Sequence, residues 1–327
     1  MYLNVWDCVD QLDDHGFTTD YIMMDGGSAN RSFTNMLFNG SPREQKYTTS
    51  DIFNVSHKIA IIQDAKHCLK KIRNGIESSR ISNVNASGRH LVNAGQSIVW
   101  DHFEEVANFN WQFGFRIHRK LTREHIELTP VSKMRNELAT SVLNRDMLFL
   151  TRSYQQSSTC RNPARLNSTV ELLKHTSVLV DVFDDVNRPI KRGDPRLSEL
   201  SSVLTYFNNW ETHVKSTITL CETKHLLSKE CRDDLNSCIL GVLSLCDTVL
   251  LDGATLTPGY LNYDLIENFF CQQRGIHHGC NTNPTVQQYG PAVNAICLGQ
   301  TTVSNKANSG ASGTCFVGSK KTKLSTK

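Results

Sequence analysis

The sequence has no hydrophobic run long enough to cross a membrane. A typical apolar stretch, Ile239–Leu245, is far shorter than the roughly 20 residues that a membrane-spanning helix requires. The N-terminal segment MYLNVWDCVDQLDD also lacks the basic region and the following apolar region of a secretory signal. These two absences argue against an integral membrane protein and against a secreted protein.

Metal-binding and nucleotide-binding signatures are missing as well. The 11 cysteines include no C-x-x-C pair, and none is paired at metal-ligand spacing with a histidine, so we do not expect a structural zinc site. An odd number of scattered cysteines is typical of reduced thiols inside a cell. Two of them, Cys238 and Cys246, fall in an apolar helical pattern, where cysteine packs as a small hydrophobic residue. The sequence has no G-x-x-x-x-G-K-[ST] motif, which excludes a Walker-type GTPase.

The charge of the whole chain is nearly balanced. Thirty-five basic and 32 acidic residues give a net charge of +3, which is less than a dedicated DNA-binding domain usually carries. The segment 301–327 differs, because it contains five lysines and no acid among many serines, threonines and glycines. That composition predicts a disordered basic tail. With 327 residues, of which 39% are hydrophobic, the chain is long enough for about two domains with real cores.

The first part of the chain has the pattern of an α/β sheet. Apolar spacing predicts a helix over 2–15, and the run TDYIMM predicts a buried strand over 19–24. This strand ends at Asp25, and after two glycines Ser28 is the expected N-cap of a helix that runs to Leu37.

A second strand follows the same plan. After a polar loop over 39–50, the run KIAIIQ predicts a strand over 58–63 that ends at Asp64, followed by a helix over 67–77. Because ligands lie at the carboxyl ends of strands in α/β sheets, Asp25 and Asp64 are candidate site residues. Aspartates at such positions often only cap helices.

The middle of the chain, 78–227, has helical patterns of apolar residues and no clear strand patterns. Its better amphipathic stretches are 100–107, 132–145 and 167–185, and two more helices are expected over 231–251 and 263–274. The predicted fold class is therefore α/β plus all-α. The predicted division is 1–77 and 228–300 for the α/β part, 78–227 for an all-α insertion and 301–327 for the tail.

Five sequence blocks, taken in order, resemble the P-element transposase family, which includes THAP-domain relatives in vertebrates. They are YIMMDGGSAN, IIQDAKHCLKKIRNGI, IVWDHFEEV with KLTREHIELTPVSKMRNELATSVL, LVDVFDDVNRP, and LNYDLIENFFCQQRGIHHGCNTNPTVQQY. One block alone carries little, but five in family order across nearly the whole chain make the resemblance specific. The sequence departs from the family pattern at Cys271, where glycine is expected, and at Lys66, where proline is expected.

The resemblance implies a partial RNase H-like catalytic domain that an α-helical GTP-binding insertion interrupts. It also implies cleavage and strand transfer of DNA, with Mg²⁺ ions held by two aspartates and one glutamate. By position in the motifs, Asp25 and Glu267 are the catalytic residues and metal ligands. The residues alone favour Asp25 as a turn former before two glycines, and Glu267 as a solvated residue on an amphipathic helix. The resemblance shifts the preference for Asp25 to a metal ligand.

The first aspartate of the family set has no counterpart in the sequence. In the family fold it lies on a strand upstream of the helix that here begins at Tyr2, so we expect the first three strands to be absent. A truncated or decayed copy, or a partial gene model, has this form, and we expect it to lack cleavage activity by itself. Two alternatives stay open: a non-catalytic DNA- or nucleotide-binding protein domesticated from a transposase, and a product that does not fold stably.

The resemblance further implies GTP as a cofactor that positions DNA ends. Its contacts carry over to Lys120, Lys133, Asp264 and either Asp184 or Asp185. A carboxylate accepts both N–H donors of the guanine edge, which makes Asp264 the candidate for base recognition, although a helix N-terminus favours an acid in any case. The implied partners are transposon-end DNA and GTP, in the nucleus; a homo-oligomer stays open.

Overall fold

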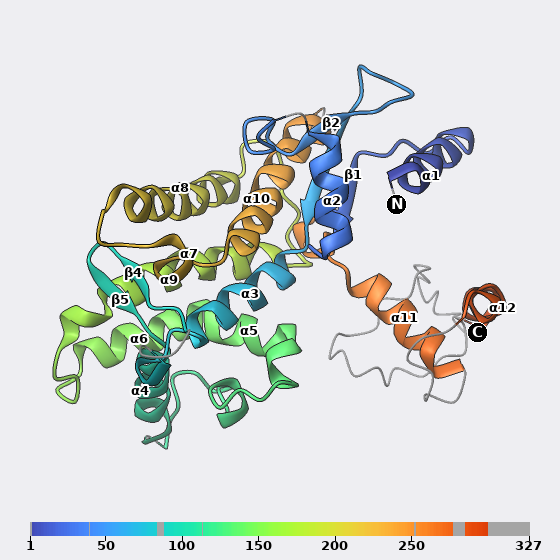
Figure 1. Ribbon diagram of the computed structural model, residues 1–327. Coiled ribbons are helices and arrows are strands. Elements are labelled where there is room, and N and C mark those ends of the chain that lie inside the picture. The colour runs from blue at the N-terminus through green and yellow to red at the C-terminus, as the bar shows by residue number, and fades with distance from the viewer. Residues whose placement is uncertain are drawn as a thin grey trace, which may run out of the picture. The chain divides into compact units, whose positions relative to one another are not determined.

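The computed structural model describes residues 2–38, 40–83, 88–112, 114–251, 253–276 and 285–299. The chain separates into two compact units, Met1–Leu261 and Asn262–Lys327. The first unit combines a small sheet with many helices (Figure 1). The predicted α/β plus all-α class is confirmed in its coarse form, as a helix-rich mixed α/β structure. The predicted tail, 301–327, lies outside the described residues.

The sheet that carries the candidate site has the strand order β1-β3-β2. Strand β1 (Tyr21–Met24) is parallel to β3 (Lys58–Gln63), and Met24 pairs with Gln63 at the end of the register. Strand β2 (Thr48–Ser50) is antiparallel to β3. The prediction of a loop over 39–50 is therefore wrong for the last three residues. Their polar composition hides the strand, which forms because it pairs along an edge of buried β3.

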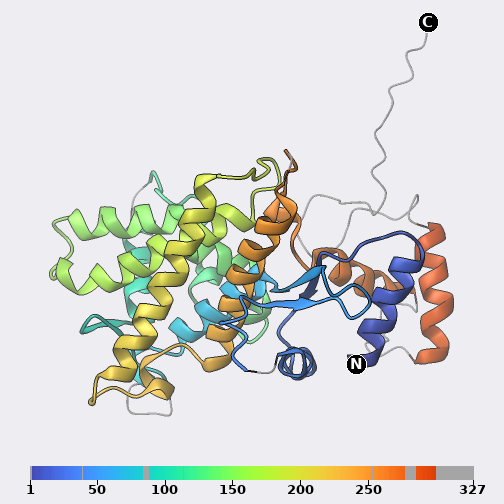
Figure 2. The same cartoon turned by 90° about the horizontal axis from the view of Figure 1, so that it is seen from above.

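Four helices surround this sheet: α1 (Tyr2–Asp14), α2 (Ser28–Leu37), α3 (Ala65–Glu77) and α10 (Lys229–Val249). Helix α10 runs alongside the strands (Figure 2) and packs on β3. The close approach requires glycine at position 241, because an added Cβ would lie 2.5 Å from the carbonyl oxygen of Ile61. Next to it, Ser237 Oγ donates a hydrogen bond of 2.9 Å to the same oxygen. Serine and glycine thus let a 21-residue helix lie directly on the sheet.

The segment between α3 and α10 is mostly helical. Its helices are α4 (Trp100–Gln112), α5 (Asn136–Leu143), α6 (Arg145–Gln156), α7 (Asn167–Phe183), α8 (Pro195–Ser216) and α9 (Glu222–His225). Short 3-10 helices lie at Ile81–Asn83, Arg123–His125, Ser132–Met134, Pro163–Leu166 and, after α10, Pro258–Tyr260.

The prediction that 78–227 contains no strands is wrong. Strands β4 (Leu91–Asn93) and β5 (Gln96–Ile98) form an antiparallel hairpin. The two residues between them, Ala94 and Gly95, have φ angles of 49° and 75°, which is the left-handed pair of a type I′ hairpin turn. Each strand has three residues, too few to show an alternating pattern in the sequence.

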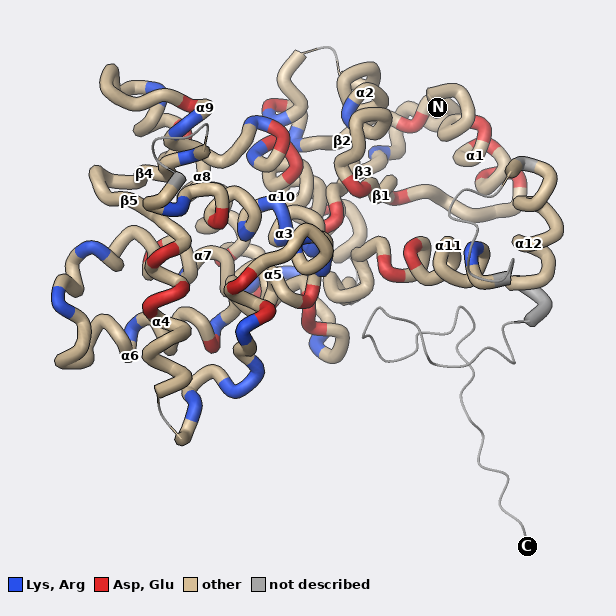
Figure 3. Tube along the Cα trace, turned by 60° about the horizontal axis from the view of Figure 1, so that its bottom comes forward, with Lys and Arg blue, Asp and Glu red and all other residues tan. Residues whose placement is uncertain are grey.

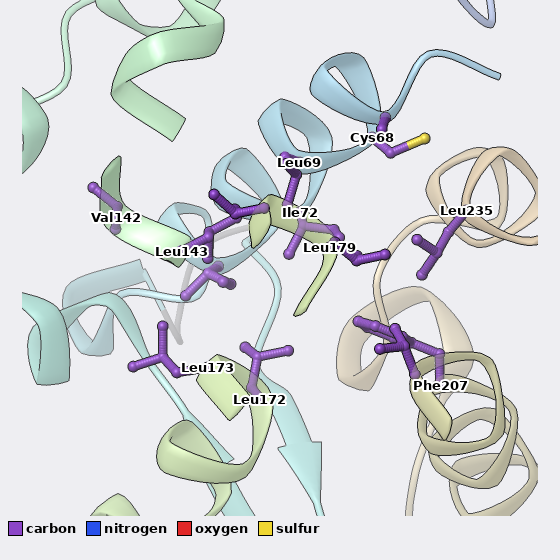
Figure 4. Packing of buried hydrophobic residues seen from close by; sticks show 14 of the residues in the cluster. Cys68, Leu69, Ile72, Val142, Leu143, Leu172, Leu173, Leu179, Phe207 and Leu235 are labelled. Carbon is purple, nitrogen blue, oxygen red and sulfur yellow. The ribbon is translucent and has the colours of Figure 1, made fainter. Parts of the chain in front are cut away.

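One hydrophobic core spans the α/β part and the helical segment. In Figure 4, Leu69 and Ile72 of α3 lie near Leu143 of α5 and Leu179 of α7. All four side chains are at most 1% exposed and belong to one cluster. Helix α3 therefore joins the two parts that the sequence analysis divides at residue 77, while the division into domains stays a prediction.

The second unit holds helices α11 (Asp264–Ile276) and α12 (Val286–Gly299) in its described part. Helix α11 confirms the helix expected over 263–274 and carries Asp264 and Glu267 in its first turn. Among the residues that the structure describes, no helix is both long and apolar enough to pass through a membrane.

Candidate functional site

Asp25 lies directly after the last residue of β1, in a turn that two glycines make. Its Oδ1 atom accepts hydrogen bonds from the backbone N–H of Gly27 at 2.8 Å and from Asn30 Nδ2 at 2.6 Å. These two donors fix the orientation of the carboxylate. Within the described residues the other oxygen, Oδ2, makes no hydrogen bond, and the side chain is part-exposed. Asp25 therefore presents one oriented carboxylate oxygen at the carboxyl end of β1, an edge strand that is parallel to β3.

An aspartate also follows the neighbouring strand β3, but its side chain caps a helix. Asp64 follows Gln63, the register partner of Met24, so it occupies the same level of the sheet as Asp25. It is 1% exposed and caps α3, where Oδ1 accepts the backbone N–H of His67 at 3.1 Å. The capping interpretation therefore holds for Asp64. At the start of α2, Gly27 rather than Ser28 occupies the N-cap position.

A buried acid, Asp234, stabilises the turn that follows Asp25. Asp234 of α10, with a side chain 4% exposed, forms ion pairs with Arg31 of α2 at 2.7 Å and with Lys71 of α3. Arg31 also donates from Nη2 to the carbonyl oxygen of Gly26 at 2.5 Å. Gly26 has φ +70°, and an added Cβ would lie 2.7 Å from Asp234 and 2.8 Å from the Lys71 ammonium. Three helices thus converge on the residue after Asp25.

A cavity of about 430 Å³, with many charged residues in its wall, opens beside this cluster. Its wall includes Arg43, Glu211 and Arg232, which form ion pairs of 3.0 and 2.5 Å through Glu211. Burial alone raises the pKa of Glu211, but the hydrogen bond from Lys215 and the charges of Arg43 and Arg232 outweigh it and lower the pKa. Glu211 is therefore ionised at neutral pH, and it ties α8 to α10 and to the loop before β2.

The catalytic residues predicted from the sequence lie in different units. Asp25 belongs to the first unit, and Glu267 is an exposed residue of α11 in the second. Among the described residues, no group of three or more His, Cys, Asp or Glu side chains is arranged to hold a metal ion. The chemistry of the donors suits Mg²⁺, because both are carboxylates and the cation prefers hard oxygen ligands.

The predicted nucleotide contacts occupy separate elements. Lys133 lies in the 3-10 helix Ser132–Met134, where its ammonium donates to Glu77 Oε2 at 2.7 Å. Its carbonyl oxygen accepts hydrogen bonds from Arg73 Nη2 at 3.0 Å and Asn74 Nδ2 at 3.2 Å. Burial lowers the pKa of Arg73 to about 10, which leaves it charged at neutral pH. The region around Lys133 is thus held firmly against α3.

The other predicted nucleotide contacts differ in their surroundings. Lys120 is exposed in the loop after α4, and Asp184 is exposed at the C-cap of α7. Asp185 accepts the backbone N–H groups of Asn187 and Arg188, and the first of these hydrogen bonds does most to lower its pKa. Asp264 begins α11, in the second unit.

Sequence reasoning identifies Asp25 but misses the residues that hold it. Asn30 and Arg31 stand one helical turn after the two glycines, within the block DGGSANR. Asp234, however, is 203 positions from its partner Arg31. No local pattern links residues at that distance in a single sequence.

Comparison with known proteins agrees with this architecture. No protein-family model matches the sequence, and a search of curated proteins finds no relative. In structure, the chain is similar to the Drosophila P element transposase in its strand transfer complex, with a TM-score of 0.72 and 17% sequence identity. The similarity covers 91% of this chain and 64% of the transposase chain. The chain therefore has a P element transposase-like fold, which confirms the predicted resemblance at the level of the fold.

Proposed function

We propose that the chain functions in DNA transposition, as the part of a transposase that contributes Asp25 and Glu267 to a Mg²⁺ site for cleavage and strand transfer. The observation that carries the proposal is the position of Asp25, at the carboxyl end of β1 in a fold similar to that of a P element transposase. A protein that acts on chromosomal DNA works in the nucleus, which we propose as its location. The RNase H-like character of the sheet is part of the same proposal.

In this proposal each residue has a limited task. Gly27 N–H and Asn30 hold Oδ1 of Asp25, which leaves Oδ2 as the oxygen that would hold a metal ion. Glu267 supplies a second carboxylate from α11. When bound, Mg²⁺ activates the attacking hydroxyl and stabilises the leaving oxygen of a phosphodiester.

GTP is the second ligand that we propose, as a positioning cofactor. Lys120 is exposed and suited to a phosphate. Lys133 contacts a phosphate in this proposal only by exchanging its ion pair with Glu77. Asp184 and Asp264 are the proposed acids, and Asp264 accepts both N–H groups of the guanine edge. Asp264→Ala should then abolish the preference for GTP over ATP in a binding titration. Equal binding of GTP and ATP to the unaltered chain would remove this assignment.

Manganese binding tests the metal site directly. Mn²⁺ replaces Mg²⁺ at oxygen sites, and its free-ion electron paramagnetic resonance signal falls on binding. We expect the chain to bind Mn²⁺, Asp25→Ala and Glu267→Ala each to lose that binding, and the control Asp20→Ala to keep it, since Asp20 is 45% exposed and lies before β1. Unchanged Mn²⁺ binding in Asp25→Ala would contradict the proposal. DNA binding without any Asp25-dependent metal would favour the non-catalytic alternative.

A further inference from the structure

The loop that follows α4 carries a run of cations without acids. Between Glu105 and Glu124 the chain contains Arg116, Arg119, Lys120 and Arg123, and no aspartate or glutamate. In Figure 3 blue segments recur along this loop, between α4 and α5. We refer to residues 114–123 as the basic loop.

The basic loop is held in one conformation by two buried anchors. His118 is 0% exposed, and the side-chain amide of Asn110 binds both its N–H (3.1 Å) and its carbonyl oxygen (3.0 Å). A further hydrogen bond of 2.8 Å joins His118 Nε2 to the carbonyl oxygen of Ser141. Leu121 is also 0% exposed, and its carbonyl oxygen accepts the indole N–H of Trp111 at 3.1 Å. These contacts fix the backbone from His118 to Leu121, and Phe115, Arg116 and Ile117 directly precede the first anchor.

The side chains before the first anchor and between the two anchors are exposed to solvent. Phe115 is 86% exposed and Ile117 is 45% exposed. Arg116, Arg119 and Lys120 are exposed, and within the described part of the chain they form no ion pair. The exposed ring of Phe115 contributes no buried area to the core, and the three cations next to it can pair with a ligand. The combination suits a polyanion with aromatic faces, which is nucleic acid.

We propose that the basic loop binds single-stranded nucleic acid, with Phe115 stacked on an unpaired base and Arg116 and Arg119 on phosphates. A duplex offers its phosphates to the arginines but keeps its base faces inside the stack, so the exposed ring favours a single strand. The inference rests on the proposed role in DNA transposition, but not on either metal ligand. Lys120 lies in the same loop, so it is left unaltered in the test to keep GTP binding separate.

The test is fluorescence anisotropy with a labelled 20-nucleotide single strand, and the matching duplex, over a series of salt concentrations. For the double variant Arg116→Ala/Arg119→Ala, we expect the slope of log K against log salt to fall by about 1.4, or about 0.7 per phosphate contact. For Phe115→Ala, we expect single-strand affinity to fall by about 5- to 160-fold with an unchanged slope. Phe115→Trp should keep the affinity.

Arg152→Ala is the matched control, because Arg152 is an exposed arginine on α6 with the same charge. It should leave both affinity and slope unchanged. Phe115→Ala with unaltered single-strand affinity would overturn the proposal, as would equal competition by polyglutamate, which would point to an acidic protein partner. If Asp25→Ala loses Mn²⁺ binding but still binds the single strand, both the metal site and the nucleic-acid site are supported. If the unaltered chain does not bind Mn²⁺, only the proposed metal site is removed.

Discussion

Two charged regions of the first unit differ in how deeply their charges are buried and in whether those charges are paired. Behind the Asp25 turn, Asp234 is almost fully buried between Arg31 and Lys71, and each charge has a partner. In the basic loop, Arg116 and Arg119 are exposed and form no ion pair among the described residues. A buried charge that lost its partner would destabilise the fold, while an exposed one costs little and remains available to a ligand. The first region should therefore respond to mutation in stability, and the second in binding.

The largest effect is expected from Asp234→Ala. Removing this carboxylate leaves two cations side by side in a largely buried place, so we expect the free energy of unfolding to fall by about 3 kcal/mol. The matched control is Asp233→Ala, since Asp233 pairs with Arg43 and Lys229 but is 37% exposed. Its loss should be below about 1 kcal/mol. Urea denaturation measures both values, and equal losses would show that burial does not set the cost of removing a paired acid from α10.

A pH titration extends the comparison to His102, a buried group that forms no ion pair within the described part of the chain. Burial, and then the charge of Arg165, lower the pKa of His102 to about 4, against about 6.5 in an unfolded chain. His102 is therefore neutral in the fold, where a hydrogen bond of 2.8 Å joins its Nδ1 to Thr169 Oγ1. Protonation favours the unfolded state, so stability is unaffected above about pH 7 and falls as the pH drops from about 6.5 to 4.

The total loss from His102 over that window should be about 3 kcal/mol. His125 and His175 also have pKa values lowered mainly by burial and act in the same direction. We therefore expect His102→Gln to flatten the dependence of unfolding free energy on pH by about one proton. His213→Gln, at an exposed position of α8, serves as the control. A wild-type slope retained in His102→Gln would show that His102 is not the group that titrates.

Much of this architecture can be predicted from local sequence. Strand β3 falls where the apolar run KIAIIQ predicts it, and α11 follows its own amphipathic pattern. The turn at Asp25 is also visible, because two glycines follow a buried strand. Elements that depend on tertiary pairing are not visible: β2 is polar and short, and the β4–β5 hairpin turns at Ala94 and Gly95 without an Asn-Gly signal.

The candidate functional site is also only partly predictable from the sequence. Asp25 is accessible to motif comparison, but its support by Asp234 depends on three helices meeting at one glycine. The exposure of Phe115 is equally hidden, since an aromatic residue in a short sequence window is normally expected in the core. Sequence patterns report which elements form, whereas the pairing of distant charges is decided only when those elements pack.

The smallest effect is expected for the ion pair between Lys133 and Glu77, which is only partly buried. Lys133 is 37% exposed, and its partner Glu77 is 15% exposed at 2.7 Å. We expect Lys133→Met and Glu77→Gln each to lower the free energy of unfolding by less than about 1 kcal/mol, with a coupling of about 0.5 kcal/mol in a double-mutant cycle. The hydrogen bonds from Arg73 and Asn74 to the Lys133 backbone remain in both variants. The 3-10 helix that carries Lys133 should therefore keep its position. A coupling near 3 kcal/mol would place this pair with the buried ion pairs of Asp234. A coupling near zero would mean that the ammonium is already available, and that a phosphate could take the place of Glu77 without cost to the fold.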